Sequence, residues 1–154
     1  MTDLLTTFYD SFARLDAEAM VRCYHPDVLF HDPAFGRLEG ERARNMWRML
    51  CASQQGKDFT VTFRDIRADE RTGSAHWEAR YTFSPSGRRV HNIIEASFTF
   101  RDGLIHTHTD QFNLHRWARQ ALGMQGLLLG GTRYFQKQLQ ARTRGMLTKW
   151  EGSL

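Results

Sequence analysis

The sequence predicts a single α+β domain in which a curved antiparallel sheet wraps around N-terminal helices. Three observations support this fold class. Apolar residues recur with helical spacing up to about residue 56, with a period of two from about residue 58 to 114, and with helical spacing again to the end. Consecutive strands flanked by helices are typical of folds that segregate the helices from an antiparallel sheet. A chain of 154 residues is also the usual size of one domain.

Three helices are expected in the N-terminal part. Asp16 is a favourable N-cap for the second helix. This helix should end before Pro26, because the residue that precedes a proline is disfavoured in the α conformation. Core-facing residues are predicted to be Leu5, Phe8, Phe12 and Leu15 in the first helix, Ala19, Met20, Cys23 and Tyr24 in the second, and Ala43, Met46, Trp47 and Leu50 in the third.

A short apolar strand at residues 28–30 should run into Asp32, with a glycine-containing loop after it. Asp102-Gly103 is the pair that tight two-residue hairpins favour, so it should join the last two strands. Four longer strands are expected as an antiparallel meander at about residues 59–64, 77–83, 90–100 and 104–114.

The basicity of the chain belongs to its last segment. Residues 1–114 hold 14 Lys/Arg and 16 Asp/Glu, whereas residues 115–154 hold seven Lys/Arg and one acidic residue, Glu151. We therefore expect a domain at 1–114 and a basic helical C-terminal extension at 115–154 that packs on it. A short helix should end at Gly123, and the apolar side of a final helix is predicted to be Phe135, Leu139, Met146 and Trp150.

A solvated helical face is one interpretation of this basic extension, and contact with an acidic partner or with anionic membrane headgroups is the other. Nucleic-acid binding is not expected, because RNP-like and zinc-finger patterns are absent.

Cys23 and Cys51 lack CxxC spacing and are predicted to be buried, reduced thiols. With neither a signal-peptide pattern nor an apolar run of membrane length, a cytoplasmic location is predicted.

Polar groups on the last strand form one candidate site. A period of two places His106, His108 and Asp110 on one face with Phe112. A histidine and a carboxylate two residues apart can tune each other for acid–base work, so His108 and Asp110 are candidate catalytic residues. The alternative is that they satisfy hydrogen bonds in the core. A shared metal ion is not expected, because His106 and Asp110 lie roughly 13 Å apart along a strand.

Asp32 is the second candidate. Pro33 stiffens its backbone, and Phe30 and Phe35 give it an apolar setting in which burial would raise the carboxyl pKa toward that of a general base. Ordinary Asp-Pro turn chemistry is the alternative.

The stretch from Asp16 to Gly36, with Tyr24-His-Pro-Asp and then Asp32-Pro33, resembles the opening of the ketosteroid isomerase-like and SnoaL-like families of the nuclear transport factor 2-like superfamily. The run from Phe98 to Asp110 is similar to their strand–Asp-Gly–strand signature. The resemblance covers roughly residues 4–114. It implies a cone-shaped, cystatin-like α+β barrel with an apolar pocket and without a cofactor.

The resemblance also implies roles for the candidates. Asp32 falls where the isomerases place their general base. His108 matches a position at which SnoaL-like proteins keep a pocket histidine, and Asp110 lies close to their pocket carboxylate.

Both oxyanion donors of the isomerases are missing. Phe8 stands near the position of their tyrosine, with Tyr9 one residue out of register. Ala96 stands near that of their acid, although a bulge could bring the adjacent Glu95 inward. A steroid isomerase of the standard kind is therefore not expected.

The aromatic content suits an apolar ligand with one or two polar handles. We predict an acid–base isomerase, cyclase or hydrolase for a small apolar carbonyl, polyketide or lipid-like compound. The alternative is a non-catalytic dimeric module that binds an apolar molecule.

A homodimer through the exposed sheet face is expected. The predicted pocket residues are Phe8, Tyr9, Phe12, Tyr24, Trp47, Trp77, Tyr81, Ile94 and Phe112.

Overall fold

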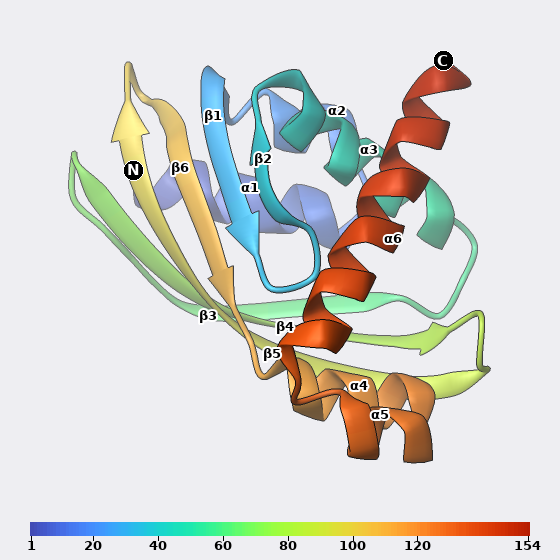
Figure 1. The fold of residues 1–154 in the computed structure, drawn as a ribbon. Helices are drawn as coiled ribbons and strands as arrows, with labels where there is room; N and C mark the ends of the chain where they lie inside the picture. Colours follow the sequence, from blue (N-terminus) through green and yellow to red (C-terminus); the bar gives the residue numbers. More distant parts are fainter.

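The computed structural model describes residues 1–154, with six strands in one curled, unclosed sheet and six helices (Figure 1). The concave side of the sheet faces the N-terminal helices, and the α+β prediction is confirmed. The helices are α1 (Thr2–Ala13), α2 (Ala17–Val21), α3 (Glu41–Gln54), α4 (Leu114–Leu122), α5 (Met124–Leu129) and α6 (Arg133–Gly152). The strands are β1 (Tyr24–Asp32), β2 (Gly36–Glu39), β3 (Thr60–Ala68), β4 (Thr72–Phe83), β5 (Arg88–Arg101) and β6 (Leu104–Gln111).

The sheet has the strand order β2-β1-β6-β5-β4-β3. The predicted antiparallel meander is present as β3 to β6. Two features differ from the expectation. The glycine-containing loop after Asp32 holds the four-residue strand β2, which is too short to be recognised from periodicity, and β1 pairs with β6 in parallel. This parallel pair joins the N-terminal part of the chain to the last strand.

The expected inward side of the second helix was wrong at Cys23 and Tyr24, which both lie beyond the end of the helix. The helix α2 ends at Val21, and Tyr24 begins β1. Pro26 therefore lies inside a strand, where the pairing with β6 shifts register between Tyr24 and Leu29. Such an irregularity tolerates a residue that has no N–H group to donate. Tyr24 is nevertheless buried, because its strand face points inward.

Local signals in the sequence determine several of the boundaries. The Asp16 side chain accepts a hydrogen bond from the Ala19 N–H at 3.0 Å and caps α2. Asp102 and Gly103 have φ angles of 53° and 73° and form the tight turn between β5 and β6. Both angles are in the left-handed region that this kind of hairpin requires. The short helix α4 ends at Gly123, as expected.

The main core contains 25 buried hydrophobic residues and includes Cys23 and Cys51, which are both free thiols. A smaller cluster lies where α4 packs on β5 and consists of Val90, Trp117, Ala118 and Ala121. None of the six helices has both the length and the apolar character that crossing a bilayer requires.

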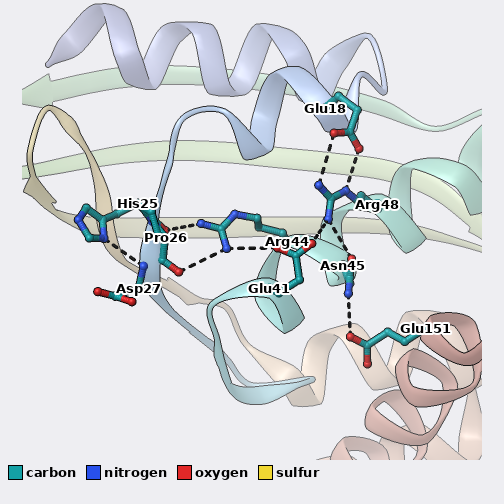
Figure 2. A network of polar contacts seen from close by, with 9 residues as sticks. All are labelled: Glu18, His25, Pro26, Asp27, Glu41, Arg44, Asn45, Arg48 and Glu151. Atoms are coloured by element: carbon teal, nitrogen blue, oxygen red, sulfur yellow. Dashed lines mark hydrogen bonds and ion pairs between the residues drawn. The ribbon is translucent and has the colours of Figure 1, made fainter. Parts of the chain in front are cut away.

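Helix α6 packs against α3. Asn45 of α3 donates a hydrogen bond to the Glu151 carboxylate at 2.8 Å, and Arg42 pairs with the same carboxylate. Arg48 extends this polar network to Glu18 of α2 (Figure 2). These contacts hold three helices together at one side of the molecule.

The predicted apolar side of the final helix was wrong at one position. Met146 is 55% exposed, whereas the adjacent Leu147 is 0% exposed and belongs to the main core. Both residues are apolar neighbours, so spacing alone does not identify the one that meets the core.

Replacement of Leu147 by alanine should therefore lower the free energy of unfolding by about 2–4 kcal/mol, because a fully buried leucine leaves a cavity. The matched replacement Met146→Ala should change it by less than about 0.5 kcal/mol. Urea denaturation of the two variants measures the difference. An equal decrease in the free energy of unfolding of both variants would show that α6 does not pack on the core through Leu147.

Candidate active site

The parallel pairing of β1 and β6 brings two carboxylates onto the same face of the sheet. Phe30 is paired with His108, and His31 with Thr109. One step further along this register, Asp32 lies beside Asp110. Their proximity is therefore a property of strand pairing between segments that are far apart in the sequence.

Asp32 ends β1 and shapes the turn that follows it. Its Oδ1 accepts hydrogen bonds from the N–H groups of Ala34 and Phe35, at 2.9 and 2.6 Å. Both bonds end on Oδ1, and the Gly36 N–H also stabilises the ionised carboxylate. Burial raises the pKa of the Asp32 carboxyl to about 7. The negative charge of Asp110 also raises this pKa, whereas the backbone hydrogen bonds lower it.

Helix α6 fixes the backbone of this turn. Gln140 donates to the Pro33 carbonyl at 3.1 Å, Thr143 to the Ala34 carbonyl at 2.8 Å, and Arg144 to the Phe35 carbonyl at 2.7 Å. The three side chains lie on one side of α6. No local pattern in the sequence indicated these residues, because their partners are more than 100 positions away in the chain.

His108 and Asp110 lie in a chain of buried hydrogen bonds. The His108 Nδ1 is 2.7 Å from the Tyr24 hydroxyl, and its Nε2 is 2.9 Å from the Asp110 Oδ1. The indole N–H of Trp47 donates to the Tyr24 oxygen at 2.7 Å, and that of Trp77 donates to the Asp110 Oδ1 at 3.2 Å. We call this set of five residues the buried polar chain.

The Asp110 carboxylate only accepts, so its hydrogen bond with His108 requires the imidazole proton on Nε2. The Tyr24 oxygen accepts from the Trp47 indole N–H, and its phenolic proton points to His108. The imidazole then accepts at Nδ1 and donates from Nε2 to the Asp110 carboxylate. Burial raises the pKa of Tyr24 well above its ordinary value, which keeps the phenol protonated as this arrangement requires.

Aromatic rings enclose His108 completely. Its exposed fraction is 0%, and ring centroids of five residues lie between 4.5 and 6.1 Å from its own: Phe8, Tyr24, Phe30, Trp47 and Phe98. The imidazole therefore has no free surface for a bound molecule. Both of its ring nitrogens are hydrogen-bonded to Tyr24 and Asp110.

Tyr9 carries the one buried side-chain polar atom that has no hydrogen-bond partner, its hydroxyl oxygen. The residue is 0% exposed. Burial raises the pKa of Tyr9 well above its ordinary value, and the negative charge of Asp110 acts in the same direction. An unpaired buried hydroxyl is costly, so this group is a candidate donor to a bound molecule.

The other predicted pocket residues divide into two groups. Tyr81 and Phe112 are half-buried and pack against the smaller cluster, where the Tyr81 hydroxyl accepts from the indole N–H of Trp117 at 2.8 Å. Those in the main core are Phe8, Phe12, Tyr24, Trp47, Trp77 and Ile94. That they line a pocket stays a prediction.

Glu95 does not reach this interior. It is exposed on the outer face of the sheet, where its carboxylate lies 2.5 Å from His76 Nδ1, whereas Ala96 is buried. His76 and His91 both contact Glu78 on the same outer face and hold the pKa of Glu78 down at about 2. The homodimer expected through this polar face stays a prediction.

No three or more His, Cys, Asp or Glu side chains gather in an arrangement that could hold a metal ion. His106 is half-buried, and its ring lies against that of His25 at a centroid distance of 5.5 Å, away from the buried polar chain.

Comparison with protein families matches residues 5–108 to the SnoaL-like domain. No curated protein matches the chain. Solved structures with the same fold include a protein from Xanthomonas campestris pv. campestris named as a polyketide cyclase, with 24% identity, a TM-score of 0.62 and coverage of 77% of this chain and 94% of that one.

A second is an LEH-like epoxide hydrolase from M. tuberculosis, with 22% identity, a TM-score of 0.61 and coverage of 83% of this chain and 89% of that one. A third is an NTF2-like protein of unknown function from Burkholderia pseudomallei, with 16% identity, a TM-score of 0.65 and coverage of 78% and 95%. At these identities the similarity shows the fold.

The raised pKa of Asp32 predicts a pH-dependent effect of its replacement. In the unfolded chain the carboxyl ionises near 3.8, whereas in the folded protein it ionises at about 7. Between about pH 3.8 and 7 the unfolded chain gives up the proton while the folded protein keeps it, so the cost to folding grows with pH and is complete above about 7. Below the unfolded-state pKa both states hold the proton and the effect vanishes.

Asp32→Asn should thus be more stable than the unchanged protein by about 1–3 kcal/mol near pH 8, and close to equal near pH 4. Denaturation at both pH values measures this, with Asp27→Asn, an exposed position of the same strand, as the matched control. A difference in stability that does not change with pH would contradict the buried placement of Asp32.

Proposed function

The chain belongs to the SnoaL-like domain family, and from this membership and its buried carboxylates we propose that it is an acid–base enzyme for a small apolar carbonyl, polyketide or lipid-like compound. The observation that carries the proposal is the Asp32 carboxylate, held by α6 at the rim of an aromatic interior with a pKa of about 7. A base is most effective when its pKa lies near the working pH.

In the proposed reaction, the Asp32 carboxylate takes a proton from the carbon next to a carbonyl group. The electrons of the broken C–H bond move onto the carbonyl oxygen and form an enolate. Return of the proton from Asp32 to another carbon completes an isomerisation. In a cyclisation the enolate carbon attacks a second carbonyl, whose π electrons move onto its oxygen, and that oxygen takes up the proton from Asp32. Asp32 then regains its starting form.

The Tyr9 hydroxyl is the donor that we propose for the developing negative oxygen. Phe8 and Ala96 have no polar side-chain atom at the positions where the resemblance would place such donors. Tyr9 is buried, protonated and without a partner of its own. A preorganised donor of this kind stabilises charge that develops in the transition state.

Asp110 and His108 influence Asp32 without contacting the substrate. The negative charge of Asp110 helps to raise the pKa of Asp32, and His108 holds Asp110 in place through Nε2. Asp32 is half-buried, so a substrate reaches the site from its side, and it must displace core side chains to reach the Tyr9 hydroxyl, which is 0% exposed. Both ring nitrogens of His108 are already hydrogen-bonded within the buried polar chain. His108 is therefore a positioning residue in this proposal.

A hydrolase uses the same groups. Asp32 would take a proton from a water molecule as the water oxygen attacks an epoxide carbon and the C–O bond of the ring breaks. The released oxygen then takes up the proton that Asp32 holds, which restores the carboxylate. The similarity to an epoxide hydrolase fold is compatible with this form of the proposal.

A non-catalytic module that binds an apolar molecule is the second candidate. The filled space around His108 and the apolar side chains of Phe8 and Ala96 favour it. In that case Asp32 and Tyr9 would only hydrogen-bond the bound molecule.

Hydrogen–deuterium exchange at the carbon next to a carbonyl tests the proposal even though the natural substrate is not known. A panel of apolar ketones and diketones is incubated with the protein in D₂O, and deuterium incorporation is followed by mass spectrometry. The rate should rise with pH through about 7, as Asp32 becomes ionised. Asp32→Asn should lower it by about 100-fold or more.

Asp27→Asn is again the control and should leave the exchange rate unchanged. A parallel panel of apolar epoxides tests the hydrolase. If native mass spectrometry shows a bound apolar compound that is returned unaltered, and neither panel reacts, the binding module is correct and the enzyme proposal is wrong.

A further inference from the structure

Helix α5 packs on the protein through its glycines. A Cβ atom added at Gly126 would lie 1.9 Å from the carbonyl oxygen of Ala118, and one at Gly130 would lie 2.5 Å from the Ala118 Cβ. The His115 Nε2 also lies 2.9 Å from the Leu127 carbonyl. Because α4 and α5 are in direct backbone contact on this side, no larger side chain of α5 can be buried there.

The leucines of α5 consequently face solvent. This is the reverse of an ordinary surface helix, whose apolar side faces the core. The exposed fractions are 70% for Met124, 48% for Leu127, 71% for Leu128 and 51% for Leu129, with 69% for Tyr134 at the start of α6. We call these five residues the α5 patch. A contiguous apolar patch of this kind marks an interaction surface.

The patch lies at one end of the molecule, where α4 and α5 project below the sheet in Figure 1. Helix α6 leaves this end and runs away across the structure, so the patch is not covered by any later part of the chain. Its apolar residues come from two consecutive segments and are available together.

The segment of the chain that carries the patch has charges of a single sign. From Gln111 to Trp150 the sequence contains no aspartate or glutamate. Arg119 on α4 and Arg133 and Lys137 on α6 are exposed on the two helices that adjoin α5. The apolar surface is thus flanked by cations that have no acidic neighbour in sequence.

We propose that the α5 patch docks the protein on the surface of an anionic lipid bilayer. Apolar side chains that enter the boundary between headgroups and acyl chains, together with flanking Lys and Arg near anionic headgroups, are the two terms that drive interfacial binding. A second copy of the chain fits less well, because two such patches face to face would bring cations against cations. This inference does not rest on the proposed enzyme activity.

Vesicle flotation tests the inference with the full chain. The protein should float with vesicles that contain phosphatidylglycerol in phosphatidylcholine, and not with phosphatidylcholine alone. Raised salt should weaken the binding, because it screens the headgroup charge. The double variant Leu127→Ser and Leu128→Ser should bind at least about tenfold more weakly.

Met146→Ser is the matched control, since Met146 is equally exposed but lies far along α6. It should bind as the unchanged protein does, and circular dichroism verifies that both variants are folded. Exchange of Arg133 and Lys137 for glutamine should weaken binding to the anionic vesicles by about fivefold or more.

Failure of the folded, unchanged protein to float with anionic vesicles would overturn the inference. Equal binding by the double leucine variant would do so as well. Light scattering that shows a dimer which the double variant loses, without vesicle binding, would mean that a second copy of the chain covers the patch. None of these results depends on turnover of any substrate.

Discussion

Everything near the candidate site depends on the buried polar chain that runs from Trp47 through Tyr24, His108 and Asp110 to Trp77. Each polar group in it is enclosed by apolar rings, and a buried donor or acceptor that loses its partner costs about 1–3 kcal/mol. The five residues come from α3, β1, β6 and β4. Satisfying them therefore requires these four elements to meet at one position, which is a stronger constraint on the fold than apolar burial alone.

The position of Asp32 follows from this constraint. Pairing of Phe30 with His108 sets the register of β1 on β6, and the same register brings Asp32 beside Asp110. Helix α6 then holds the turn after Asp32 through three side-chain contacts to its carbonyl groups. The C-terminal helix thus belongs to the site, and its docking through Leu147 and Glu151 supports the geometry of a carboxylate more than 100 residues earlier.

Much of this arrangement could be predicted from the sequence wherever one short segment carries the signal. Asp16 and the Asp102-Gly103 pair specify a helix start and a hairpin by local chemistry. Period-two spacing places His108 and Asp110 on one face of β6, and the Asp-Pro context indicates Asp32. These features need no knowledge of what packs against them.

The remaining features depend on contacts between distant segments. Tyr24 has apolar spacing that suits a helix, and only its pairing with β6 makes it part of a strand and a partner for His108. Met146 and Leu147 are both apolar, and the contact with the core decides between them. The hydrogen bonds from Gln140, Thr143 and Arg144 to the turn after Asp32 have no local signature. The enclosure of His108 by five rings, which removes it from direct contact with a ligand, was also not predictable from the spacing.

The most direct test of the account is the position of the proton on the His108 imidazole, measured by ¹⁵N–¹H correlation of the histidine side chains. The buried polar chain predicts a proton on Nε2, donated to Asp110, and none on Nδ1, which accepts from the Tyr24 hydroxyl. A proton found on Nδ1 and none on Nε2 would contradict it, because an unprotonated Nε2 would then face the Asp110 carboxylate with no proton to donate.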